Sequence, residues 1–172
     1  MVDRLRQNRD VTSSRRRRAS AGQVPSRVPE FEFTDQFGRE LHERLYDGVA
    51  VIVVAGDREG AAGVALWTAA LRAVIGDDDT RVLPVADLGG VPRILRRLVG
   101  RLLPRDPAHW CALDWDGQLG APIRGERGPL VAAAYGADRV LRVWASLPLD
   151  TVESATLVRL VEGAGTVSTG NS

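Results

Sequence analysis

One stretch decides the fold, residues 49–75, with the sequence VAVIVVAGDREGAAGVALWTAALRAVI. Its first six residues are apolar and mostly β-branched, a pattern typical of a strand that is covered on both faces and lies at the centre of a sheet. Apolar residues then recur at helical spacing from Leu66 to Ile75, which predicts an amphipathic helix. Asp57 lies in the connecting turn, where it is expected to cap the helix.

The turn itself is unusual in the side chains that it lacks. A strand, turn and helix of this kind often present a reactive group at the helix N-terminus, yet residues 55–60 contain no Cys, Ser, Thr, His or Lys. The segment also lacks the Gly-Lys-Ser/Thr ending of a phosphate-binding loop, and its two carboxylates would repel an anion. Acid–base chemistry by Asp57, Arg58 and Glu59 is one hypothesis, and local salt bridging explains the three residues more simply.

The flanking sequence extends this unit in both directions. The other expected elements are a short strand and turn at 31–38, one or two helical turns at 39–46, strands at 80–85 and 110–113, a sheet-covering helix at 92–103, an antiparallel hairpin at 130–134 and 140–145, and a final helix opened by a capping box at 150–153. Residues 118–129 are expected to be irregular. Strand-helix-strand crossovers imply parallel strands and the hairpin adds antiparallel ones, so we predict an α/β sandwich with helices on both faces.

Composition indicates one domain with two tails. The chain has 172 residues, of which 44% are hydrophobic and 26% charged, and no apolar run reaches the length of a transmembrane helix. We predict a disordered Arg-rich tail at 1–29, an ordered domain at 30–162 and a flexible end at 163–172. The run 15–18 is all Arg, but the apolar segment of a twin-arginine signal does not follow it, so we expect a cytoplasmic protein.

The basic residues are placed unevenly along the chain. All of them are Arg, which makes Arg richness alone weak evidence for nucleic-acid binding, and eight Arg against three acids precede residue 31. Two interpretations of the tail remain: a solvated leader, or an arm that contacts phosphates or an anionic membrane.

In the order of its elements the chain resembles the thioredoxin-like superfamily, and within it the redoxin branch of alkyl hydroperoxide reductases and thiol-specific antioxidants (peroxiredoxin-like proteins). The matching segments are 33–38, the strand 49–54 with its turn and helix, 85–87, 113–117, 128–129 and the hairpin. The resemblance covers roughly residues 30–162 and implies a three-layer sandwich with a central mixed sheet.

The resemblance also implies where a reactive thiol would lie. In the superfamily this cysteine lies at the start of the helix after the first central strand, where backbone N–H groups and the helix dipole lower its pKa. Here the corresponding Cys-x-x-Cys positions are Arg58 to Ala61, with Glu59 and Gly60 between them, and none is a cysteine. The family's proline before the hairpin, often cis, corresponds to Pro129.

The only thiol in the chain is Cys111, so an internal disulfide and a Cys-x-x-Cys pair are excluded. Its neighbours predict a strand, where burial would raise its pKa and make it inert. The alternative is an edge-strand thiol that is oxidised or links two subunits, and a homo-oligomer stays open. His109 beside it gives at best two ligands of a zinc site.

Two further constellations carry hypotheses. Asp114 and Asp116, two apart in an extended chain, could point together as in a magnesium site, although Gly117 favours a surface turn. The predicted helix at 92–103 is striped with Arg93, Arg96, Arg97 and Arg101. It is either a sheet-covering helix with a solvated face or a docking surface for an acidic partner or membrane.

These patterns lead to three hypotheses of function. The first is a cytoplasmic thioredoxin-like, redoxin-type domain that lacks the catalytic cysteines and acts as a binding or regulatory module without a cofactor or metal. The second is a divergent thiol-dependent antioxidant oxidoreductase that uses Cys111 or an external thiol. The third is the thiol-independent enzyme at Asp57, Arg58 and Glu59.

Overall fold

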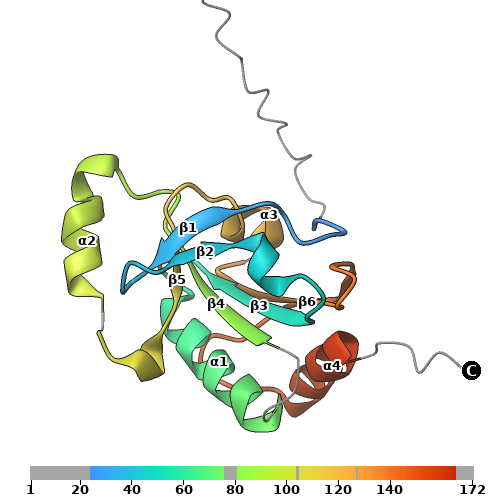
Figure 1. Cartoon of the computed structure of the whole chain (residues 1–172). Coiled ribbons are helices and arrows are strands. Elements are labelled where there is room, and N and C mark those ends of the chain that lie inside the picture. Colours follow the sequence, from blue (N-terminus) through green and yellow to red (C-terminus); the bar gives the residue numbers. More distant parts are fainter. Residues whose placement is uncertain (1–23, 76–80, 104, 127, 166–172) are drawn as a thin grey trace, which may run out of the picture.

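The computed structural model describes residues 24–75, 81–103, 105–126 and 128–165, which build one mixed seven-stranded sheet with helices on both faces (Figure 1). The strands are β1 (Glu32–Asp35), β2 (Glu40–His42), β3 (Val51–Gly56), β4 (Arg81–Asp87), β5 (Ala112–Asp114), β6 (Leu130–Tyr135) and β7 (Leu141–Ser146). The helices are α1 (Ala61–Ile75), α2 (Arg96–Leu102), α3 (Gly120–Arg124) and α4 (Ser154–Gly165), with 3-10 turns η1 (Glu43–Tyr46), η2 (Arg93–Leu95) and η3 (Pro107–His109). The predicted α/β sandwich with a mixed sheet is confirmed.

Strand β3 connects the two halves of the core. All six of its residues are buried, as the continuous apolar run predicts, and it pairs in parallel with β4 and antiparallel with β6. Val51 and Val53 face the layer that contains Ile123 of α3. Ile52 and Val54 face the opposite layer, which is formed by α1 and α4. The strand order is β2-β1-β5-β4-β3-β6-β7, so β4 occupies the middle position and β3 lies beside it.

The segment at 39–46 differs from its prediction. Only η1 is helical, whereas Glu40–His42 forms strand β2 and pairs antiparallel with β1. The reason lies in the turn between them, where the carboxylate of Asp35 accepts hydrogen bonds from the backbone N–H groups of Phe37 (2.8 Å) and Arg39 (2.9 Å). These bonds fold the chain back along β1, and the strand ladder then competes successfully with a helix.

The packed region extends beyond both predicted domain boundaries. Val28 is buried in the core, and residues 26–28 pair with the start of β7 through a bridge between Arg27 and Val140 and a hydrogen bond from the N–H of Leu141 to the carbonyl of Ser26 (2.8 Å). At the other end Ala164 is buried in α4. The rest of the predicted tails, residues 1–23 and 166–172, lies outside the described residues.

Helix α4 begins later than the predicted capping box, at Ser154. The preceding segment is held extended, because the N–H of Leu147 bonds to the carbonyl of Leu130 (3.0 Å) and the carbonyl of Pro148 accepts the indole N–H of Trp67 (2.9 Å). The helix at 92–103 also differs from its prediction, since it divides into η2 and α2 and has no buried residue. Among the described residues no helix combines the length and apolarity needed to cross a bilayer.

Candidate functional site

The turn after β3 is organised by the carboxylate of Asp57. Its Oδ1 accepts hydrogen bonds from the backbone N–H groups of Glu59 (2.9 Å) and Gly60 (3.1 Å), just before α1 begins at Ala61. The N–H of Asp57 in turn bonds to the carbonyl of Pro129 (3.0 Å). The predicted cap is therefore present, although its bonds go to the turn. The N–H groups that would polarise a thiol are already bonded to a carboxylate.

Steric crowding at Gly60 closes the same turn from the other side. A Cβ atom at this position would lie 2.1 Å from the carbonyl oxygen of Pro129, closer than any side chain can approach. Within the four positions that correspond to the family's dithiol, Gly60 thus has no room for a side chain. Arg58, Glu59 and Ala61 are exposed and sterically free to carry one.

Pro129 lies against the turn as the resemblance predicts, but its peptide bond differs from the expected one. No described peptide bond is cis, so Pro129 follows a trans bond. Gly128 has a φ of +137°, a conformation open to glycine, and this lets the chain change direction before β6 without a cis bond.

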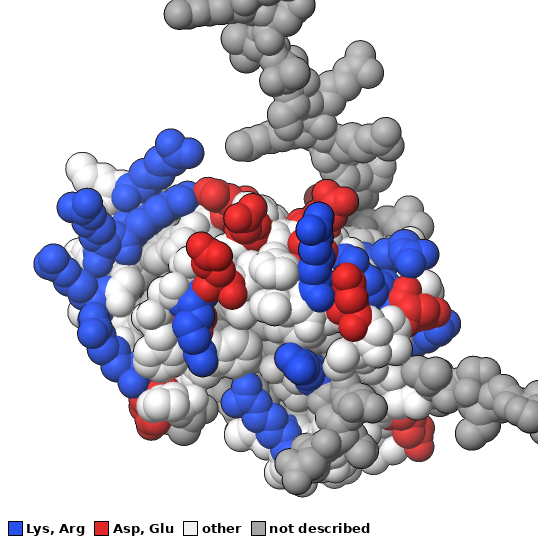
Figure 2. Space-filling view, viewed as in Figure 1, with Lys and Arg blue, Asp and Glu red and all other residues white. Residues whose placement is uncertain are grey.

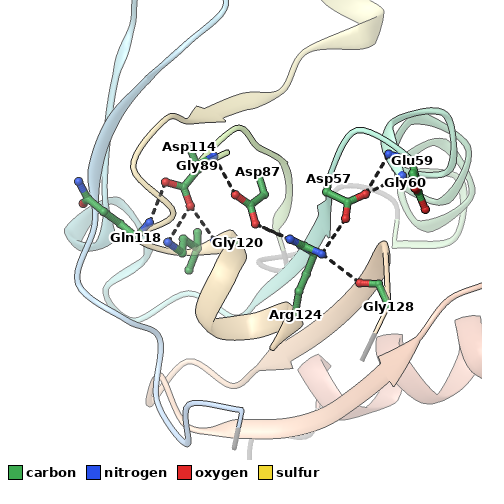
Figure 3. Close-up of polar contacts among 11 residues, drawn as sticks. Asp57, Glu59, Gly60, Asp87, Gly89, Asp114, Gln118, Gly120, Arg124 and Gly128 are labelled. Atoms are coloured by element: carbon green, nitrogen blue, oxygen red, sulfur yellow. Dashed lines mark hydrogen bonds and ion pairs between the residues drawn. The ribbon is translucent and has the colours of Figure 1, made fainter. Parts of the chain in front are cut away.

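Arg124, at the end of α3, completes the turn from a distant part of the sequence (Figure 3). Its Nη1 lies 2.9 Å from Asp57 Oδ2 and donates to the carbonyl of Gly128 (3.1 Å). Its Nη2 lies 2.8 Å from Oδ2 of Asp87, the last residue of β4. The Arg124 side chain is 17% exposed and that of Asp87 is 5% exposed, so this pairing is largely withdrawn from water. The salt bridge expected within 57–59 is therefore formed by Asp57 with Arg124 instead.

A third carboxylate, that of Asp114 at the end of β5, is fully buried. It accepts three backbone N–H groups, those of Gln118 (2.8 Å), Leu119 (2.8 Å) and Gly120 (2.7 Å), and so fixes the start of α3. Asp116 instead pairs with Arg96 at 2.9 Å. The magnesium-site hypothesis is wrong, because the two carboxylates have separate partners, and the described residues hold no cluster of three metal-ligating side chains.

One signal in the sequence could have predicted this arrangement. Asp57 follows β3, and Asp87 and Asp114 end β4 and β5, which are three neighbouring parallel strands. Because the carboxyl ends of parallel strands meet at one sheet edge, the three carboxylates must lie near one another and need compensating donors. Arg124 supplies the cation for the first two.

Cys111 lies just before β5, between Trp110 and the first strand residue. Burial, and to a smaller extent the charge of Asp35, raises the pKa of the Cys111 thiol to about 11. The thiol is therefore protonated at neutral pH, as the sequence predicts for a cysteine in apolar surroundings.

A pocket of about 310 Å³ separates Cys111 from the turn. Its walls are mainly apolar and come from α1, β4 and the segment after α2; they are formed by Ala61, Ala62, Val64, Ala65, Thr68, Pro84, Ala86, Leu103, His109, Trp110 and Cys111. Ala61 belongs both to this wall and to the positions of the missing dithiol. The pocket thus opens beside the turn, at the place where the resemblance locates the superfamily's chemistry.

Comparison with solved structures identifies the architecture. The chain superposes on a thiol:disulfide interchange protein assigned as DsbE from Chlorobium tepidum with a TM-score of 0.59 at 12% identity, covering 82% of this chain and 99% of that one. The fold is thioredoxin-like. An exposed lipoprotein thioredoxin, Etrx1 of Streptococcus pneumoniae, gives a TM-score of 0.58 at 18% identity, with 77% and 98% covered. Copper-bound yeast Sco1 gives 0.54 at 13% identity, with 86% and 98% covered.

Comparisons at the sequence level give no match, either to a protein-family model or to a curated protein. The thioredoxin-like fold carries the resemblance at low sequence identity, and these structural neighbours are disulfide-exchange, thioredoxin and Sco proteins rather than peroxiredoxins.

Proposed function

We propose that this thioredoxin-like domain is a non-catalytic binding module. The observation that carries the proposal is the turn before α1, where Asp57 accepts the N–H groups of Glu59 and Gly60 and is paired with Arg124. A thiolate at this place needs those N–H groups and is destabilised by a neighbouring carboxylate. The narrower assignment to the redoxin branch rests on the order of sequence elements alone.

The single thiol supports the same proposal. With a pKa of about 11, Cys111 is almost entirely protonated at neutral pH and is a slow nucleophile. It also lacks a second cysteine in the chain with which to form a reversible disulfide. A thiol mechanism through Cys111 would need both a different ionisation and an external partner thiol.

The pocket beside the turn is the ligand site that we propose for this module. Its size is at the lower end of the range of small-molecule sites. Its walls from Ala61, Val64 and Ala86 suit an apolar group, either of a small molecule or of a side chain presented by a partner. Binding there would use the face that thioredoxin-like proteins offer to their substrates, without bond exchange.

The absence of thiol chemistry is tested by turnover. Wild type and Cys111→Ser are assayed for reduction of insulin disulfides with dithiothreitol and for consumption of hydrogen peroxide. We expect no turnover above buffer from either protein. Turnover in wild type that is lost in Cys111→Ser would overturn the proposal in favour of a divergent thiol oxidoreductase.

The pocket is tested by filling it. Ala65→Phe places a ring in the pocket, whereas Ala73→Phe makes the same change at an exposed position of α1 outside it. With the uncharged dye Nile red as probe, Ala65→Phe should lower the bound fluorescence and Ala73→Phe should leave it at the wild-type level. Equal fluorescence in the three proteins would remove the pocket as a ligand site.

A further inference from the structure

The segment formed by η2 and α2 stands beside the sheet instead of covering it (Figure 1). Its aliphatic side chains point into solvent, with Ile94 88% exposed, Leu98 55% and Leu102 75%. The two faces of the sheet are already covered, one by α1 and α4 and the other by α3. The apolar stripe that predicted a buried helix is therefore available for another partner.

Two parallel stripes run along this segment. Ile94, Leu98 and Leu102 recur every four residues, and Arg93, Arg97 and Arg101 recur with the same spacing one position earlier. In a helix, neighbours in sequence are about 100° apart around the axis, so the cationic stripe borders the aliphatic one. Figure 2 shows arginine side chains along the edge of the molecule where α2 lies, with uncharged surface between them. We call these six residues the α2 face.

Arg96 has a different role from the other arginines of the segment. Its Nη2 donates to the carbonyl of Trp115 (2.8 Å) and to Asp116 Oδ1 (2.9 Å), and its guanidinium lies over the Trp115 ring, 5.7 Å from the centroid. These contacts attach α2 to the turn after β5. Arg93, Arg97 and Arg101 have no hydrogen bond or ion pair with other described residues, so their charges remain free to meet a ligand.

The charge of the segment selects the class of partner. No Asp or Glu occurs between Asp87 and Asp106, so the α2 face has no acid to neutralise it. Two copies meeting through this face would bring six arginines together, which opposes a symmetric dimer. The surface that satisfies both stripes is apolar below and anionic above.

We propose that the α2 face docks on an anionic phospholipid bilayer. Aliphatic side chains that project as far as Ile94 and Leu102 enter the boundary of the acyl chains, while arginines beside them reach the phosphates. A fluid bilayer accepts such projections anywhere, whereas a protein would need matching hollows. The docking is independent of the proposed pocket, because none of the six residues lines it.

Vesicle flotation of the full chain tests the proposal. The probes are phosphatidylcholine vesicles with and without phosphatidylglycerol. One variant carries Arg93→Gln, Arg97→Gln and Arg101→Gln; another carries Ile94→Asn, Leu98→Asn and Leu102→Asn. The matched controls change exposed residues elsewhere: Arg44→Gln, Arg58→Gln and Arg159→Gln for charge, and Leu45→Asn, Val74→Asn and Val158→Asn for aliphatic surface.

We expect wild type and both controls to float with the anionic vesicles only. The three-arginine variant should bind about a hundredfold more weakly, since each arginine near an anionic surface contributes about 1 kcal/mol. The aliphatic variant should also lose binding, which a purely electrostatic attachment would not. Circular dichroism checks that each variant is folded.

Three results would overturn the proposal. Wild type that fails to float with anionic vesicles, or floats equally with neutral ones, would remove the bilayer as partner. Equal loss in the control and α2-face arginine sets would show that net charge, rather than this face, determines binding. Retention on immobilised polyglutamate without flotation would instead identify an acidic polypeptide as the partner.

Discussion

The guanidinium of Arg124 lies 2.9 Å from the carboxylate of Asp57 and so joins α3 to the turn that precedes α1. The same guanidinium contacts Asp87 at the end of β4. Three segments far apart in the sequence are thereby tied together at the carboxyl end of the sheet, around the place where thioredoxin-like enzymes carry out their chemistry.

Removing Arg124 should destabilise the fold strongly. Arg124→Met keeps the length of the side chain but leaves the nearly buried carboxylate of Asp87 without its cation, which costs on the order of 3 kcal/mol in the free energy of unfolding. Arg142→Met is the control, because Arg142 pairs with Asp138 at the surface and such pairs contribute less than about 1 kcal/mol. Urea unfolding of the two variants measures the difference, and equal losses would refute a structural role for Arg124.

The two aspartates that resemble helix caps should behave differently. Asp114→Ala leaves three buried N–H groups without an acceptor and should lower the free energy of unfolding by at least about 2 kcal/mol. Asp150→Ala should stay within about 0.5 kcal/mol of wild type, since α4 begins only at Ser154. Thermal denaturation of both variants tests this, and a large effect at Asp150 would restore the capping box that the sequence suggests.

Two glycine substitutions should have opposite effects. Gly60→Ala forces a Cβ to within 2.1 Å of the Pro129 carbonyl oxygen, and the required backbone shift should cost about 3 kcal/mol. Gly100 lies in α2, and a Cβ added there would meet no atom within 4 Å, so Gly100→Ala should stabilise the helix by up to about 1 kcal/mol. If Gly60→Ala unfolds at the same urea concentration as wild type, the turn is less tightly packed than the structure describes.

Alkylation of Cys111 should depend steeply on pH. With a pKa of about 11, compared with 9.0 for an unperturbed thiol, the folded protein should react slowly with iodoacetamide at pH 7 and about tenfold faster for each pH unit up to about 11. The chain unfolded in urea is the control and should level off near pH 9. Because the folded state holds the proton more tightly, stability should fall as the pH rises from about 9 to 11. Rapid labelling of the folded protein at pH 7 would contradict the raised pKa.

The local elements of this fold could largely be predicted from the sequence. The β-branched run of β3 announces a strand buried on both faces, because few other structures accommodate six consecutive apolar residues. The hairpin β6–β7 and the raised pKa of Cys111 follow in the same way from apolar neighbours. Each of these features depends mainly on a residue and its immediate surroundings.

The features that were missed depend on tertiary contacts. Helix α3 has only five residues, too few to show a helical period, so Arg124 gave no sign of its partners. The stripe of Ile94, Leu98 and Leu102 has the period of a buried helix, but the pattern cannot tell whether the sheet still has an uncovered face. The two sheet faces were occupied by other helices, and the stripe remained exposed.

The two edges of the sheet have a consequence for the behaviour of the protein at high concentration. One edge is the three-residue strand β2, and the start of the other, β7, is overlaid by residues 26–28. Amyloid-like growth needs a long row of free backbone donors and acceptors onto which further chains can add. The folded domain offers only a short row on one side and a partly blocked one on the other, so fibril growth from its edges is disfavoured.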